Sequence, residues 1–220
     1  GNPSELYVYS VDGTFENTVT VNNQENTDWE DLSQDTKGNI YIGNFGNNDN
    51  KRKDLRILKV DGSDLTSNSI NTSQETTFYY EDQTDFPPKK SNLLYDCEAF
   101  VATNDAFYLF TKNRSKGFDG TFYVYKVPNK NGNFKAEKIA TLQTCGQYKS
   151  CAITSAALNK NGNEITLLTH DKVFLIPFVN DNSFKQENIT IKELGHNSQK
   201  EAITFKSEKE LFMADESEKG

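Results

Sequence analysis

The sequence is poor in the side chains that most often build catalytic or metal centres. Its 220 residues include two histidines, three cysteines, one methionine and one tryptophan. The motifs GxSxG, HExxH, GxGxxG and the P-loop are absent, and so is a DxDxDG calcium loop. The shortage of histidine and cysteine disfavours a zinc site. A catalytic cysteine would have only His170 and His196 to serve as its base.

Long apolar runs and clusters of basic residues are missing as well. No apolar segment is long enough to cross a bilayer, so we expect no membrane insertion. The formal net charge is -8, and Lys and Arg are not concentrated in any one segment, so nucleic acid is not an expected partner. The length fits a single domain with a real core, which we place at 1–220.

Two of the three cysteines lie close together in TCGQYKSC (144–151). Cys145 and Cys151 either close this polar loop as a disulfide or remain two reduced thiols, because spacing alone does not decide between them. A disulfide would favour an oxidising compartment. Cys97 is expected to be a small buried residue. No signal peptide is present, and an exported protein whose leader has been removed would look the same.

Aromatic residues, in contrast, are abundant. Phe, Tyr and Trp make up 12 % of the chain, and such side chains pack well on a pleated sheet. Short apolar segments of alternating character are separated by polar turns along the whole chain, which is typical of half-buried strands. No segment predicts a helix of more than two turns.

The chain also repeats itself. The triplet DWE (28–30) has counterparts in DCE (96–98) and QKE (199–201), and a weaker one in TSA (154–156), where the glutamate is lost. Each is followed by an apolar strand, a polar loop and a second strand. β-Units of roughly 40–50 residues whose lengths vary in the loops are typical of a β-propeller.

We therefore predict an all-β protein, a β-propeller of four-stranded antiparallel blades. Four repeats are visible. Because a four-bladed ring is uncommon, this favours a fragment of a five- or six-bladed ring. Alternatively, N-terminal strands close the ring, because SELYVYSVDG (4–13) matches KDLRILKVDG (53–62). A sandwich or jelly roll is the other fold considered, but it does not explain the returning triplet. The predicted blade segments are 4–22, 28–82, 96–143, 153–194 and 199–216.

Equivalent positions on the innermost strands of a propeller point to one place in the central channel. Glu30, Glu98 and Glu201 are therefore expected to converge, with Asp28 and Asp96 close by. Clustered carboxylates repel one another unless a cation or protons lie among them. Oxygen ligands suit Ca²⁺, which tolerates irregular geometry, so a calcium site is one hypothesis. The other is that these carboxylates accept backbone N–H bonds from the neighbouring blade and hold the ring together.

The ends of the second strands predict a polar rim that carries both charges, a surface suited to a polar ligand. Its residues are Asn44, Asn47, Lys112, Arg114, His170, Asp215 and Glu216. Within this set His170 is a candidate general base, and Lys112 or Arg114 a candidate for stabilising an anion. The alternative is that these residues are solvated loop ends.

The stretch DWEDLSQDTKGNIYIGNFGNN (28–48) and five later segments carry a family resemblance. The later segments are DCEAF (96–100), FYLFTKNR (107–114), TFYVYKVP (121–128), TSAAL (154–158) and QKEAI (199–203). Together they resemble a group of secreted or cell-surface propellers common in Bacteroidota, and more distantly phytase-like and SdiA-regulated-type bacterial propellers. The resemblance implies export and a calcium-bound centre at Glu30, Glu98 and Glu201. The chain departs from the group at Asn44, where the group often has Asp, and at Ser155-Ala156.

Two functions follow as hypotheses. The first is an exported, non-enzymatic propeller, in the periplasm or on the cell surface, that binds a protein or a polar small ligand at its rim, with Ca²⁺ in the centre. The second is a Ca²⁺-dependent hydrolase of a phosphoester or lactone, in which the glutamates hold the ion and His170 or Lys112 assists.

Overall fold

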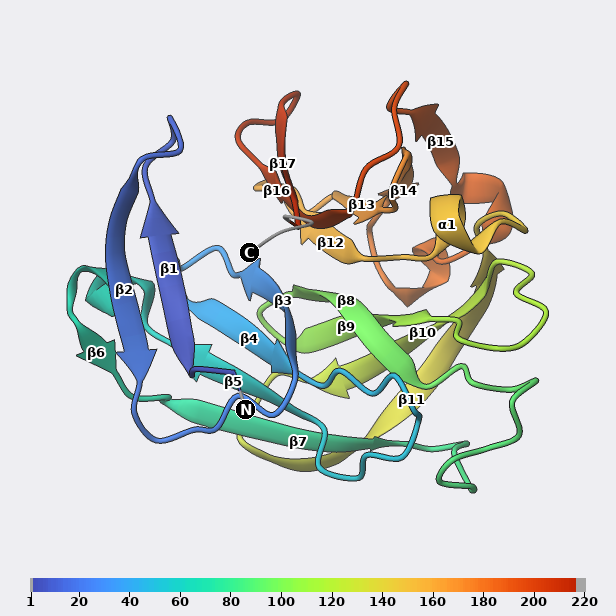
Figure 1. The fold of residues 1–220 in the computed structure, drawn as a ribbon, viewed down its shortest axis with the longest axis horizontal. Coiled ribbons are helices and arrows are strands. Elements are labelled where there is room, and N and C mark those ends of the chain that lie inside the picture. The colour runs from blue at the N-terminus through green and yellow to red at the C-terminus, as the bar shows by residue number, and fades with distance from the viewer. Residues whose placement is uncertain (1, 217–220) are drawn as a thin grey trace.

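The computed structural model describes residues 2–216 and is built mainly of strands (Figure 1). Strands account for 48 % and helices for 7 %, so the predicted all-β class is confirmed. Residues 1 and 217–220 of the predicted domain lie outside the described part. The helical segments are the short η1 (Gly62–Thr66), α1 (Tyr148–Cys151), η2 (Asp181–Ser183) and η3 (Gln186–Asn188). None of the helices in residues 2–216 is long and apolar enough to cross a membrane.

Twelve of the strands pair antiparallel in three groups of four, each in chain order, although β6 (Ser69–Ile70) interrupts the first group and pairs elsewhere. The first group is β3 (Trp29–Gln34), β4 (Ile40–Asn44), β5 (Arg56–Val60) and β7 (Gln74–Tyr80). The second is β8 (Asp96–Ala102), β9 (Ala106–Lys112), β10 (Thr121–Pro128) and β11 (Gly132–Gln143). The third is β12 (Ser155–Leu158), β13 (Glu164–Leu168), β14 (Lys172–Pro177) and β15 (Thr190–Glu193).

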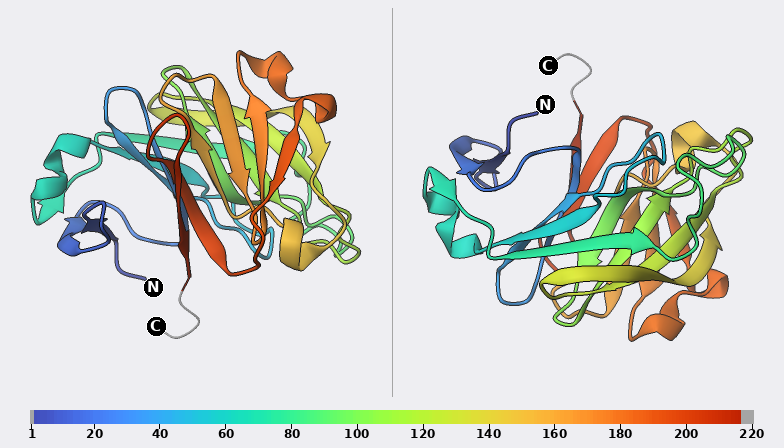
Figure 2. Two further views of the ribbon diagram at one scale, coloured as in Figure 1. Left: turned by 90° about the horizontal axis from the view of Figure 1, so that it is seen from above. Right: turned by 90° about the horizontal axis from the view of Figure 1, so that it is seen from below.

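The first two groups are joined at their outer strands. β7 and β11 pair in parallel and run side by side in the view from below (Figure 2). The resulting eight-stranded sheet has β3 and β8 as its end strands, and these also lie next to each other. The sheet is therefore nearly closed and barrel-like. This topology does not confirm the finer prediction of separate four-stranded propeller blades.

The remaining strands form two smaller sheets. β16 (Lys200–Phe205) and β17 (Leu211–Asp215) make a hairpin. β1 (Glu5–Tyr9) pairs with β2 (Phe15–Val21), and β2 pairs in parallel with β6 (Ser69–Ile70). In the described residues β1 does not pair with β17, so the alternative in which N-terminal strands complete the last blade is not seen.

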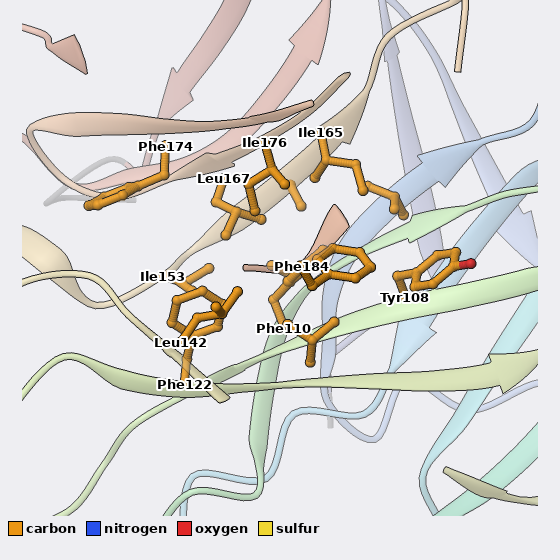
Figure 3. Close-up of a cluster of buried hydrophobic side chains, with 14 of the residues drawn as sticks. Tyr108, Phe110, Phe122, Leu142, Ile153, Ile165, Leu167, Phe174, Ile176 and Phe184 are labelled. Carbon is orange, nitrogen blue, oxygen red and sulfur yellow. The ribbon is translucent and has the colours of Figure 1, made fainter. Parts of the chain in front are cut away.

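The second strand of each group is buried on both faces, because apolar side chains point to either side of it. On β9, Tyr108 and Phe110 pack against the third group, whereas Phe107 and Leu109 pack against the first. Figure 3 shows the core between the second and third groups, with side chains from the two groups facing each other. Similar cores join β1 and β2 to the first group, and the third group to β16. Consecutive groups thus pack face to face around the molecule, as Figure 1 also shows.

One buried carboxylate connects the first strands of three groups. Asp31 on β3 is 7 % exposed, and its carboxylate accepts hydrogen bonds from the backbone N–H of Phe100 (3.1 Å) and Ala156 (3.2 Å). It also accepts from the hydroxyl of Ser155 at 2.9 Å and the N–H of Leu32 at 3.0 Å. Burial raises the pKa of Asp31 to about 7, although these four donors act in the opposite direction.

Two hydroxyl groups extend these connections. The Ser33 hydroxyl on β3 accepts from the N–H of Ala102 on β8 at 2.9 Å. The Ser155 hydroxyl on β12, besides donating to Asp31, accepts from the N–H of Ile203 on β16 at 3.2 Å. The first strands β3, β8, β12 and β16 are therefore held together by side chains of β3 and β12 that bond the backbone of their neighbours.

We expect Asp31→Ala to destabilise the protein strongly. The substitution leaves the Phe100 and Ala156 N–H groups and the Ser155 hydroxyl buried without an acceptor, at about 1–3 kcal/mol each. The free energy of unfolding, measured with urea, should fall by about 3 kcal/mol or more. Asp64→Ala removes an exposed carboxylate and is the matched control. Equal stability of the two variants would contradict the role given to Asp31.

Candidate functional site

The repeated glutamates share one local irregularity of the backbone. In each strand that carries one, the pairing with the next strand slips at the glutamate, between Trp29 and Leu32, between Cys97 and Ala99, and between Lys200 and Ala202. β12, where alanine replaces the glutamate, pairs with β13 without a slip. A β-bulge bends its strand and re-aims a side chain, and bulges are common beside functional sites. The bulges therefore turn Glu30, Glu98 and Glu201 out of the regular side-to-side alternation of their strands.

Glu98 lies in a buried network with two basic residues. The Lys112 ammonium contacts Glu98 Oε2 at 2.8 Å, and Arg114 donates to Glu98 Oε1. Arg114 Nε also donates to Asp96 Oδ2 at 2.7 Å, and the Asn47 N–H donates to the other Asp96 oxygen. Asp96 is fully buried, and Glu98 and Lys112 are about 5 % and 6 % exposed. The register of β8 with β9, which places Asp96 opposite Lys112, brings these groups together.

The electrostatics of this network are set by burial and by the close charges. Burial lowers the pKa of Lys112, but the Glu98 carboxylate outweighs it, so the pKa is raised overall. Arg114 also has a raised pKa, because Asp96 and Glu98 outweigh its burial. Both side chains therefore remain cations at neutral pH.

Of the three repeated glutamates, Glu30 is the one whose carboxylate has no bonding partner in the described residues. Within residues 2–216 its carboxylate makes no hydrogen bond and no ion pair. Burial raises its pKa to about 9, with further increases from the charges of Glu98, Asp96 and Asp28. It lies against Gly46, where an added Cβ would come within 2.2 Å of Glu30 Oε1 and 2.5 Å of the Asp28 carboxylate. The absence of a side chain at Gly46 thus makes room for both carboxylates.

Glu201 is linked to a histidine. His170 Nε2 lies 3.4 Å from Glu201 Oε1, and His170 Nδ1 lies 3.1 Å from the carbonyl oxygen of Lys149. The carbonyl can only accept, so Nδ1 carries the hydrogen, and a bond between Nε2 and Glu201 requires one further proton on the pair. Burial raises the pKa of Glu201, as does the charge of Glu98, while Lys112 and His170 oppose the rise.

The three repeated glutamates, together with Lys112 and Arg114, line one cavity of about 540 Å³. Its charged lining residues are Glu30, Glu98, Lys112, Arg114, Glu201, Asp215 and Glu216. The three repeated glutamates, predicted to converge, thus line a common space, as do four of the predicted rim residues. We call this space the charged cavity. Five of its lining side chains are acidic and two are basic.

The donor set does not fit the predicted calcium ion. Both oxygens of Glu98 are engaged by Lys112 and Arg114, which places two positive charges where a cation was expected. Across residues 2–216, no group of three or more His, Cys, Asp and Glu side chains is arranged to hold a metal. Ca²⁺ needs six to eight oxygen ligands.

Two residues placed on the exposed rim by the sequence are in fact buried, which corrects that prediction. Asn44 is fully buried, since its side chain accepts from the N–H of Asp28 and donates to the carbonyl of Glu25. Asn47, 2 % exposed, donates to the carbonyl of Tyr95. Both amides satisfy backbone groups of the surrounding loops and do not line the charged cavity.

The cysteine loop is closed. Cys145 and Cys151 form a disulfide with 5.5 Å between their Cα atoms, and Cys97 is a buried free thiol. α1 lies inside the loop, and its Tyr148 hydroxyl accepts a hydrogen bond from Arg114 Nη1 at 2.6 Å.

Sequence reasoning missed Tyr148 and Asp31. Tyr148 carries no signal in the sequence, because it reaches Arg114 across two groups of strands. Asp31 does carry one: it follows the repeated glutamate where the other units have Ala99, Ala157 and Ala202. A charged residue at a position that is otherwise alanine marks a special contact.

Comparison with known proteins adds no relative. No family model matches the chain, and a search of curated proteins finds no match. The resemblance to secreted propellers of Bacteroidota therefore stays a prediction.

The raised pKa of Glu30 predicts a pH dependence of stability. Between about pH 4.5 and pH 9 the folded protein keeps a proton on Glu30 that the unfolded chain has released. The stability from this group is complete below that range and is lost as the pH rises through it. Glu30→Gln removes the effect. From pH 5 to pH 8.5 the wild-type Tm should therefore fall by roughly 10 °C more than that of the variant.

Glu16→Gln, at an exposed position on β2, is the matched control for Glu30→Gln and should follow the wild type. Differential scanning calorimetry at the two pH values provides the comparison. Parallel Tm curves for wild type and Glu30→Gln would show that Glu30 titrates normally.

Proposed function

We propose that the chain is a non-enzymatic binding module of β-propeller architecture that takes a polar ligand or a protein partner in the charged cavity. Groups of four antiparallel strands with a core between each pair of neighbouring groups support this architecture. The parallel pairing of β7 with β11 is then a contact between the outer strands of two adjacent blades. The strands β3, β8, β12 and β16 are the innermost strands.

The observation that carries the proposal is the charged cavity with its buried floor. Burying an ion pair costs desolvation energy, so such a pair is weak evidence for stability alone. Here the Glu98–Lys112–Arg114 network lies at the base of an open cavity, and each repeated glutamate is set there by a bulge. Fixed charges in a concave site are what recognition of a polar ligand requires.

The charge balance of the cavity favours a ligand group that is positively charged. Lys112 and Arg114 are already paired with Glu98 and Asp96. Glu30 makes no ion pair within the described chain and holds a proton that a bound cation can displace, and Asp215 and Glu216 are exposed at the cavity. An ammonium or guanidinium group, on a small molecule or on a partner protein, complements these carboxylates.

Export to the periplasm or the cell surface is part of the proposal. The Cys145–Cys151 disulfide supports it, since such bonds persist mainly in oxidising compartments. The resemblance to secreted propellers points the same way.

An NMR titration tests the proposed ligand class. Spermidine and Nα-acetyl-lysinamide should shift the backbone amide signals of Glu30, Glu98 and Glu201, and N-acetylglutamate should not. Glu30→Gln should weaken binding of the cationic probes by about tenfold, which corresponds to about 1.4 kcal/mol. That value lies close to the range for a hydrogen bond to a charged group.

Glu137→Gln, an exposed carboxylate on β11, is the control and should leave binding unchanged. If cationic probes at millimolar concentration shift no signal at the cavity, or if the anionic probe binds as well, the proposal is wrong.

A further inference from the structure

The disulfide loop makes contacts that its own closure does not require. α1 is a single turn of four residues inside the Cys145–Cys151 loop. A single helical turn is unstable in water by itself, so its shape depends on outside constraints. One is the disulfide, and another is the Thr144 hydroxyl, which donates to the carbonyl of Cys151 at 2.7 Å. Two further contacts run to Arg114, which lines the charged cavity, and to His170, which meets the cavity residue Glu201.

The first contact runs through a tyrosine. The Tyr148 hydroxyl accepts from Arg114 Nη1 at 2.6 Å, while its ring packs edge-on against Phe118 at 5.3 Å between centroids. Arg114 also donates through Nε to Asp96 and through Nη2 to Glu98. Tyr148 therefore holds the third guanidinium nitrogen, the one that the two carboxylates do not bond.

The second contact runs through a backbone carbonyl. Lys149 O accepts from His170 Nδ1 at 3.1 Å and from Asn197 Nδ2 at 3.3 Å. His170 in turn meets Glu201 through its other nitrogen. A single short helix is thus bonded to Arg114 of the second strand group and to His170 of the third.

We propose that the disulfide loop is a positioning element of the charged cavity, which holds Arg114 through Tyr148 and His170 through Lys149. This positioning role depends on the proposed function only where it concerns ligand binding. Opening the loop frees α1, and both side chains lose the contact that fixes their orientation. A dithiol reductant does this by giving two electrons and two protons to the bond, which yields two thiols and an oxidised, cyclic reductant.

The test follows the side chains directly and needs no ligand. The Nε–H signal of Arg114 is observed by NMR in the wild type, in Cys145→Ser/Cys151→Ser and in Tyr148→Phe. Its hydrogen exchange should be about tenfold faster in the double variant and intermediate in Tyr148→Phe, which keeps the ring but loses the hydroxyl. The Nε–H of Arg52, which bonds Asp54 away from the loop, is the internal control and should not change.

Binding of spermidine is the second arm. Treatment with dithiothreitol should weaken it severalfold in the wild type and leave it unchanged in the double serine variant. If spermidine fails to bind the oxidised protein, the proposed ligand class is wrong, but Arg114 exchange still decides the positioning role. Arg114 exchange that is the same in all three proteins would overturn that role. Should the double variant not fold, Tyr148→Phe and the reduced wild type give the same decision.

Discussion

The arrangement of the first strands of the groups, β3, β8, β12 and β16, depends on the carboxylate of Asp31. The three groups of four strands and the β16–β17 hairpin pack on one another through apolar cores, and non-directional contacts of this kind do not by themselves tie the first strands together. Asp31 fixes how the strands lie against one another, because its two oxygens accept directional hydrogen bonds. The donors are Phe100 on β8 and Ser155 and Ala156 on β12. Ser155 passes the connection on to β16. A buried carboxylate is costly unless its donors are in place, so the structure tolerates few other arrangements of these strands.

The charged cavity is a consequence of that arrangement. With β3, β8 and β16 gathered together, the bulges at Glu30, Glu98 and Glu201 lie on the same side of the strands. Repulsion among these carboxylates is relieved by Lys112 and Arg114, which the second strand group itself supplies. Two cations do not balance the lining acids, and the excess negative charge defines what the cavity attracts.

Much of the fold and of the charged cavity could be predicted from the sequence, and the predictions that differ from the structure do so for physical reasons. The strands, the repeat and the convergence of the glutamates follow from period-two alternation and from the returning triplet. Calcium is one of two hypotheses that the sequence offers for the repeated glutamates, whereas Lys112 is the cation beside Glu98. The pairing of Asp96 with Lys112 across β8 and β9 depends on register, which the triplet alone does not fix. Asn44 and Asn47 were placed on the rim, because polar residues at strand ends are usually solvated. Their bonds to loop backbone appear only once the loops are folded.

Native-state hydrogen exchange of the Phe100 and Ala156 amides tests the central role of Asp31 most directly. Both N–H groups donate to the same carboxylate from different strand groups. If Asp31 holds β3, β8 and β12 together, the two amides exchange only through global unfolding, with equal free energies of opening that match the free energy of unfolding. Exchange of either amide through local fluctuations, at a rate close to that of the surface turns, would contradict the account.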